Sequence, residues 1–203
     1  SPSRQMWMVG VTGTNGKTSC TYLMESVWRA AGISCGVGGT INQRGPGFER
    51  AAHLTTPDAI ELQAFLAELR EAGARWAALE VSSHALAQHR IEGCVFRAAI
   101  FTNLTRDHLD YHCDEEEYFA AKLLLFTRHL VPGSGVAVLN ADDPREDQIR
   151  RARGGEPVVT YSGSGDARPD VRIVADSGTG GAARGRIVGM GNDITFSSRL
   201  FGE

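Results

Sequence analysis

A glycine-rich loop near the start of the chain constrains its fold more than any other feature. Residues 6–11 are an apolar run that predicts a buried strand, and the loop after it holds Gly13 and Gly16. Lys17 and Thr18 come next, and a helical pattern begins there. A strand, a glycine loop, a Lys-Thr pair and a helix form the layout of a phosphate-binding loop. Lys17 is then expected on the outer phosphates and the Thr18 hydroxyl on Mg²⁺.

The physical reason for this layout lies in the backbone. Glycine lets the chain bend sharply and bring its N–H groups close to phosphate oxygens, while a helix N-terminus favours negative charge. The loop departs from strict Walker A spacing, which requires a glycine where this chain has Val11. An ordinary glycine-rich turn is the alternative. The strand before the loop and the helix after it favour the phosphate site.

Composition excludes several classes of protein. A chain of 203 residues with 42% hydrophobic content suits one large α/β domain, or one domain with a small appendage. Its net charge of −3 gives no basic surface for nucleic acid. No apolar run is long enough for a membrane helix, and no signal peptide opens the chain. Four scattered cysteines without a C-x-x-C pair favour free thiols in the cytoplasm over a zinc site.

Alternating strand and helix patterns predict a mostly parallel, P-loop-type sheet flanked by helices. We expect strands at about 6–12, 34–38, 75–81, 96–102 and 135–139. We expect helices at about 17–31, 57–72, 82–89, 114–129 and 142–153. Thr56 is expected as N-cap of the second helix with Pro57 at its first position. Residues 39–56 are expected to form a long surface loop.

The last fifty residues differ from the rest. They are rich in glycine, and residues 170–175, 186–188 and 194–198 are expected to form short antiparallel strands. We therefore predict an α/β body at 1–155 and a small antiparallel β appendage at 156–203.

Two further polar side chains follow predicted strands, where ligands of open α/β sheets gather. Glu80 ends an apolar strand and is expected as a second Mg²⁺ ligand; a solvated acid at a strand end is the alternative. His108 follows another strand, and a structural histidine is the alternative there.

Lys122 stands among apolar residues of a predicted helix. Burial disfavours the charged amine and lowers a lysine pKa. The amine is then available for covalent modification or for metal-site chemistry. A side chain that extends its amine to solvent is the alternative.

Seven motifs occur in order along the chain. They are Thr12-Gly-Thr-Asn-Gly-Lys-Thr18, Leu54-Thr-Thr-Pro-Asp58, Glu80-Val-Ser-Ser-His84, Gln88-His-Arg90, Phe101-Thr-Asn-Leu-Thr-Arg-Asp-His-Leu-Asp-Tyr-His112, Ala120-Ala-Lys122 and Asn140-Ala-Asp-Asp143. Together they closely resemble the central ATP-binding domain of the Mur ligases. Within that family they are most similar to the members that add the third residue of the peptidoglycan stem peptide.

The resemblance implies an ATP- and Mg²⁺-dependent amide ligase acting on UDP-N-acetylmuramoyl-L-alanyl-D-glutamate (UDP-MurNAc-L-Ala-D-Glu) and an amino acid. In such ligases the substrate carboxylate attacks the γ-phosphate to give an acyl phosphate, and the incoming amine displaces the phosphate. This order makes chemical sense, since a carboxylate does not react with amines until its oxygen becomes a good leaving group.

The resemblance also assigns roles to residues. ATP binding falls to Gly13, Thr14, Asn15, Gly16, Lys17, Thr18 and Ser19. Metal binding falls to Thr18 and Glu80, with His108 on a second Mg²⁺. Binding of the muramoyl dipeptide falls to Thr55, Thr56, Ser82, Gln88 and Arg90. Lys122 matches the family lysine that becomes a carbamate, and Lys17, Lys122 and His108 are the catalytic candidates.

Two observations limit the resemblance. Cys113 stands where the family usually has glycine, which affects only a local turn. The N-terminal UDP-binding domain and the C-terminal amino-acid domain of full-length ligases have no counterpart here, so we expect a monomeric central domain that does not turn over alone. Two alternatives stay open: a related ligase of the folylpolyglutamate or cyanophycin type, and a non-catalytic nucleotide-binding module.

Overall fold

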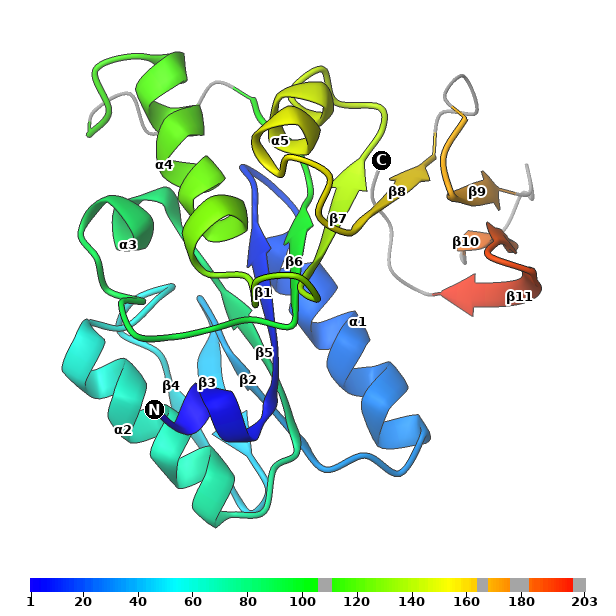
Figure 1. Ribbon diagram of the computed structural model, residues 1–203. Coiled ribbons are helices and arrows are strands. Elements are labelled where there is room, and N and C mark those ends of the chain that lie inside the picture. Colours follow the sequence, from blue (N-terminus) through cyan, green and yellow to red (C-terminus); the bar gives the residue numbers. More distant parts are fainter. Residues whose placement is uncertain (106–110, 164–167, 176–182, 199–203) are drawn as a thin grey trace.

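The computed structural model describes residues 1–105, 111–163, 168–175 and 183–198, and it confirms the predicted α/β class. Eleven strands form one sheet in the order β11-β10-β9-β8-β7-β6-β1-β5-β2-β3-β4 (Figure 1). The helices are η1 (Pro2–Gln5), α1 (Lys17–Ala30), α2 (Ala59–Glu71), α3 (Ser83–Ala87), α4 (Glu115–Arg128) and α5 (Glu146–Ala152). The strands are β1 (Trp7–Thr12), β2 (Cys35–Gly38), β3 (Asn42–Gly45), β4 (Phe48–Ala51), β5 (Trp76–Glu80), β6 (Ala98–Phe101), β7 (Val136–Asn140), β8 (Val158–Ser162), β9 (Val171–Ala175), β10 (Ala183–Gly189) and β11 (Asn192–Ser198).

Strands β2, β5, β1, β6, β7 and β8 run parallel and form the centre of the sheet. Their side chains alternate between two apolar layers. Val9 and Ala78 face α1 and its Trp28, whereas Met8 and Leu79 face the layer that contains α2, α4 and α5. Figure 1 shows α1 on the opposite side of β1 and β5 from α2. Because both faces are covered, the central strands consist almost wholly of apolar residues.

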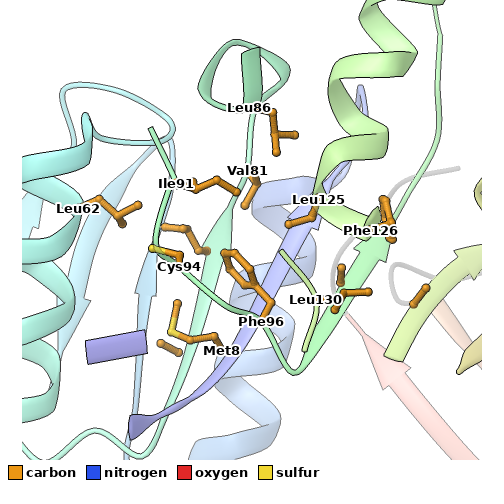
Figure 2. Close-up of a cluster of buried hydrophobic side chains, with 14 of the residues drawn as sticks. Met8, Leu62, Val81, Leu86, Ile91, Cys94, Phe96, Leu125, Phe126 and Leu130 are labelled. Carbon is orange, nitrogen blue, oxygen red and sulfur yellow. The ribbon is translucent and has the colours of Figure 1, made fainter. Parts of the chain in front are cut away.

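The larger apolar layer holds the sheet to α2, α3 and α4 (Figure 2). Phe96, just before β6, is fully buried and lies beside Met8, Cys94 and Leu125 in this layer.

Replacing Phe96 by alanine is expected to lower the free energy of unfolding by about 3–5 kcal/mol, because it removes buried apolar surface and leaves a cavity. Chemical denaturation measures this change. Val27→Ala on α1 is the control, since Val27 is 65% exposed and its loss should change stability by less than about 0.5 kcal/mol. A similar loss for both variants would show that this layer does not dominate the stability of the domain.

The prediction of a long surface loop at residues 39–56 is wrong in part. β3 and β4 form a hairpin there, and β3 pairs with the edge of the sheet at β2. The strands are mostly polar, so their sequence shows no apolar alternation. Tertiary contacts hold them instead: the Arg44 guanidinium pairs with the buried Glu25 carboxylate of α1, and the Tyr22 hydroxyl donates to Asn42 Oδ1 over 2.7 Å.

The start of α2 also differs from the prediction. Asp58 is its N-cap, and its carboxylate accepts hydrogen bonds from the N–H groups of Ile60 and Glu61. Thr56 is fully buried and bonds elsewhere: its hydroxyl donates to the Glu80 carbonyl over 2.8 Å and accepts from the Ser82 N–H. Because tertiary contacts occupy the Thr56 side chain, Asp58 caps the helix instead, two residues later than predicted.

The C-terminal strands extend the sheet. β8 lies parallel to β7 and β9 lies parallel to β8, whereas β10 is antiparallel to both of its neighbours, β9 and β11. The antiparallel strands expected at 170–175, 186–188 and 194–198 are thus confirmed, with Ile187 opposite both Ile173 and Ile194. The division of the chain after residue 155 stays a prediction.

The structure also shows the state of the four cysteines. The thiols of Cys20, Cys35, Cys94 and Cys113 form no disulfide. Burial raises the pKa of the Cys20 and Cys94 thiols to about 11, so both stay protonated near neutral pH.

In the described part of the chain, no helix has the length and apolar content to cross a membrane.

Candidate functional site

One pocket of about 440 Å³ lies at the carboxyl ends of β1, β2 and β5. This edge is where ligands of parallel α/β sheets bind. The lining residues come from the glycine loop, from the segments after β2 and β4, and from β5 and α3. They are Thr14, Asn15, Gly16, Lys17, Thr18, Ser19, Thr40, Leu54, Thr55, Thr56, Glu80, Ser82, His84 and Arg90.

The glycine loop connects β1 to α1 as predicted. Gly16 is the N-cap of α1 with a φ of 83°, and within the described residues no side chain caps this helix. The first amides of α1 therefore meet the pocket without a side-chain acceptor, which suits an anion. Gly13 has a φ of 146°, and a Cβ on it would lie 1.9 Å from Thr102 Oγ1. Both glycines are required by the shape of the loop.

The segment after β6 holds this loop in place. The N–H of Thr14 donates to the Asn103 carbonyl over 2.9 Å, and the N–H of Asn15 donates to Asn103 Oδ1 over 3.0 Å. The Thr102 hydroxyl donates to the Asn15 carbonyl over 2.7 Å. The loop is therefore preformed, because its turn is fixed by groups outside it.

Lys17 lies along the inside of the loop. Its Nζ donates to the carbonyl oxygens of Gly13 at 2.9 Å and Thr14 at 2.8 Å. The amine thus sits at the pocket wall beside the loop amides, close to where an anion would bind.

Lys122 lies beneath the same loop. It is 1% exposed, and its Nζ donates to the Gly13 carbonyl over 2.9 Å and lies 4.2 Å from the centre of the Tyr118 ring. A lysine whose amine reaches solvent is therefore ruled out. The apolar residues around Lys122 in the sequence correspond to a buried side chain in the structure. Its partner Gly13 lies 109 positions earlier in the chain.

Glu80 is fully buried at the end of β5, which excludes the solvated acid. Its Oε2 accepts a hydrogen bond from the Thr18 hydroxyl over 2.9 Å. A carboxylate and a hydroxyl side by side are oxygen ligands that suit Mg²⁺, which commonly binds one or two protein groups together with substrate phosphates. Within the described ranges no cluster of three or more acidic, histidine or cysteine side chains occurs. The donor set thus fits a cation shared with a bound ligand.

The expected substrate-binding residues form a connected group at the pocket, the expected substrate wall. Thr55, Thr56, Ser82 and Arg90 line the pocket. Arg90 Nη1 donates to the Thr56 carbonyl over 3.0 Å, and its Nε and Nη2 donate to Gln88 Oε1. Gln88 does not line the pocket but orients Arg90. The structure therefore brings all five residues to one side of the site.

Residues 106–110 lie outside the described residues, so the prediction for His108 and its second metal ion stays untested by the geometry. Asn140 is the first residue of the seventh motif, and its Nδ2 donates to the Thr102 carbonyl over 2.8 Å. This bond ties the end of β7 to the segment that holds the loop.

Three lining residues, Thr40, Leu54 and His84, were not among the predicted site residues. Thr40 follows β2 and bonds to Glu80, and the rule that singled out Glu80 at a strand end applies to it equally. His84 lies within the third motif, and its ring contacts that of Tyr111, with 4.1 Å between ring centres and 39° between the ring planes. A threonine after a glycine pair carries too little signal to stand out alone.

Comparison with known proteins decides the family. The Mur ligase middle domain family matches residues 11–203. The chain belongs to the Mur ligase family. The resemblance of the seven motifs to this family is thereby confirmed.

Individual Mur ligases show where the chain fits. It is 44% identical over 202 residues to UDP-N-acetylmuramoyl-L-alanyl-D-glutamate–2,6-diaminopimelate ligase of Trichormus variabilis, covering 100% of this chain and 40% of that protein. A solved structure of a ligase with the same name is 33% identical with a TM-score of 0.84, covering 97% of this chain and 40% of that one. Mycobacterium tuberculosis folylpolyglutamate synthase, solved with ADP and AMPPCP, shares the fold alone, at 16% identity and a TM-score of 0.65 over 96% of this chain and 50% of that one.

Proposed function

We propose that this chain is the ATP-binding middle domain of an amide ligase that adds the third residue of the peptidoglycan stem peptide to UDP-MurNAc-L-Ala-D-Glu. The observation that carries the proposal is the shared pocket, which is lined by the phosphate loop, the Thr18–Glu80 pair and Arg90. The identity of 44% to a ligase of that name supports this substrate over folate-type acceptors, whose ligase is 16% identical.

The nucleotide half of the pocket would take ATP. The amides at the start of α1 and the Lys17 amine supply positive charge for its phosphates. Thr18 and Glu80 would hold the Mg²⁺, which when bound neutralises charge on the transferring phosphoryl group. The ADP and AMPPCP in the folylpolyglutamate synthase structure support a nucleotide in this fold.

Lys122 is proposed to carry a carbamate. The lone pair of the neutral amine attacks the carbon of CO₂, an N–C bond forms, a C=O electron pair moves onto oxygen, and one proton leaves to solvent. The Lys122 side chain is almost fully buried, and this step needs its amine in the neutral form. The carbamate nitrogen keeps one N–H, so it can still donate to the Gly13 carbonyl that Lys122 contacts now. The new anion, with His108, would hold a second Mg²⁺.

The expected substrate wall would take the muramoyl dipeptide. Arg90 presents a guanidinium that suits a carboxylate or phosphate, and Thr55, Thr56, Ser82 and Gln88 surround or orient it. The chain spans 30–40% of the length of the curated relatives it matches, so the uridine and amino-acid sites are proposed to lie in other domains. A monomeric protein in the cytoplasm is proposed, where ATP and UDP-linked precursors are made.

The test is a ligase assay on the full-length protein with ATP, Mg²⁺ and UDP-MurNAc-L-Ala-D-Glu. The expected result is one ADP and one phosphate for each amide formed, with 2,6-diaminopimelate and lysine compared as the amino acid. Removing Mg²⁺ with EDTA should abolish turnover.

The control acceptor is UDP-MurNAc-L-Ala, which lacks the glutamate carboxylate and should give no amide. Amide formation on a folate acceptor would contradict the proposal in favour of a related ligase. ATP binding without any amide product would favour a non-catalytic module.

A further inference from the structure

Thr40, the threonine after β2, holds the Glu80 carboxylate at two points. Its N–H donates to Oε1 over 3.0 Å and its hydroxyl donates to Oε2 over 3.0 Å. The terminal torsion of a glutamate side chain is broad and weakly fixed by its own rotamer preferences. Two donors from one residue, each on a different oxygen, fix the plane of this carboxylate.

Gly39 brings that backbone close to Glu80. A Cβ on Gly39 would lie 2.0 Å from Glu80 Oε1, so only glycine allows the chain to approach the carboxylate this closely. The buried acid and the segment after β2 are therefore packed as one unit, although Thr40 itself is exposed to the pocket.

The Thr40 hydroxyl also contacts the expected substrate wall. Its Oγ1 lies 3.1 Å from Thr55 Oγ1. A hydroxyl has one proton, and Thr40 gives its proton to Glu80, so Thr55 must be the donor in this second bond. A directed chain of hydroxyls thus runs from Thr55 through Thr40 to Glu80.

We infer that Thr40 is a positioning residue that orients Glu80 toward the cation and links it to Thr55 on the substrate wall. This inference rests on the proposed function, because it concerns the cation that Glu80 would hold. Hydrogen-bond partners of metal ligands commonly affect metal affinity by 10- to 100-fold. Thr40 fits that role because it contacts both Glu80 and Thr55.

The test compares Thr40→Val and Thr40→Ser in the full-length protein. Mn²⁺ stands in for Mg²⁺, and electron paramagnetic resonance measures its affinity in the presence of a non-hydrolysable ATP analogue. We expect Thr40→Val to bind Mn²⁺ about tenfold more weakly and Thr40→Ser, which keeps the hydroxyl, to bind within about twofold of wild type. Thr127→Val is the control, since that hydroxyl bonds to the Leu123 carbonyl on α4, away from the pocket.

A double-mutant cycle tests the link to Thr55. As a single substitution, Thr55→Val should weaken Mn²⁺ binding a few-fold. Without the Thr55 hydroxyl as donor, the Thr40 hydroxyl is no longer held with its proton directed toward Glu80. The same change should have no further effect in the Thr40→Val background, because the hydroxyl that transmits it is gone.

The outcomes distinguish failure of the positioning role of Thr40 from failure of the proposed function. If wild type binds Mn²⁺ with the nucleotide and folded Thr40→Val binds it equally well, the positioning role is overturned while the proposed function stands. Additive effects of Thr40→Val and Thr55→Val would overturn the link between the walls. If wild type shows no cation-dependent nucleotide binding, the proposed function fails, and this inference fails with it.

Discussion

Glu80→Gln is expected to lower kcat of the full-length protein in the proposed ligase reaction by about a thousandfold while leaving the fold intact. The cation would lose an anionic ligand, and several kcal/mol of transition-state stabilisation correspond to about three powers of ten in rate. The fold should survive because the amide oxygen can still accept from the Thr40 N–H. The amide NH₂ then faces the hydroxyls of Thr18 and Thr40, which can rotate to accept.

The measurement is kcat at saturating ATP and substrate, together with thermal unfolding. Glu71→Gln is a matched control, since Glu71 is 71% exposed at the end of α2 and should leave both quantities unchanged. A Glu80→Gln enzyme within tenfold of wild type would mean that this carboxylate does not hold the cation.

Lys122→Ala is expected to reduce kcat by about 10²–10³-fold through loss of a charged group close to the phosphate loop. The loop should keep its shape, because Lys17 also donates to the Gly13 carbonyl. The variant leaves space beneath the loop that a small molecule can fill, and this allows the chemical state of Lys122 to be tested.

Adding acetate or methylamine to Lys122→Ala distinguishes a carbamate from an amine as the working group. If the working group is a carbamate, acetate should restore part of the activity of Lys122→Ala and methylamine should not. If the working group is the amine, methylamine should restore activity and acetate should not. Mass spectrometry of the wild-type enzyme with bicarbonate gives an independent readout, and a bare amine in the assembled full-length enzyme would contradict the carbamate.

The features that the sequence predicted well are those encoded in short, contiguous stretches. The phosphate loop is one, because the strand, the glycines and Lys17-Thr18 are adjacent along the chain. The start of α4 is another: Asp114 caps the helix and acidic residues fill its first turn, as a helix N-terminus requires. The α/β class followed from the alternation of strand and helix patterns.

The errors arose where long-range contacts override local preference. Thr56 has the side chain of an N-cap, but bonds to Glu80 and Ser82 occupy it, and Asp58 caps α2 instead. β3 is polar, and its register depends on contacts such as that of Arg44 with Glu25, so no period-two apolar pattern marks it.

By itself the sequence determined the family, the parallel α/β fold and the chemical types of the site residues, because these depend on motif order and hydrophobic period. Only the tertiary structure decided which of those groups meet. It placed Lys122 beneath Gly13, Thr18 against Glu80, and Thr40 between Glu80 and Thr55. The physical reason is that parallel strands gather their carboxyl ends at one edge, whatever the distance along the chain, so contacts there follow strand order rather than sequence order.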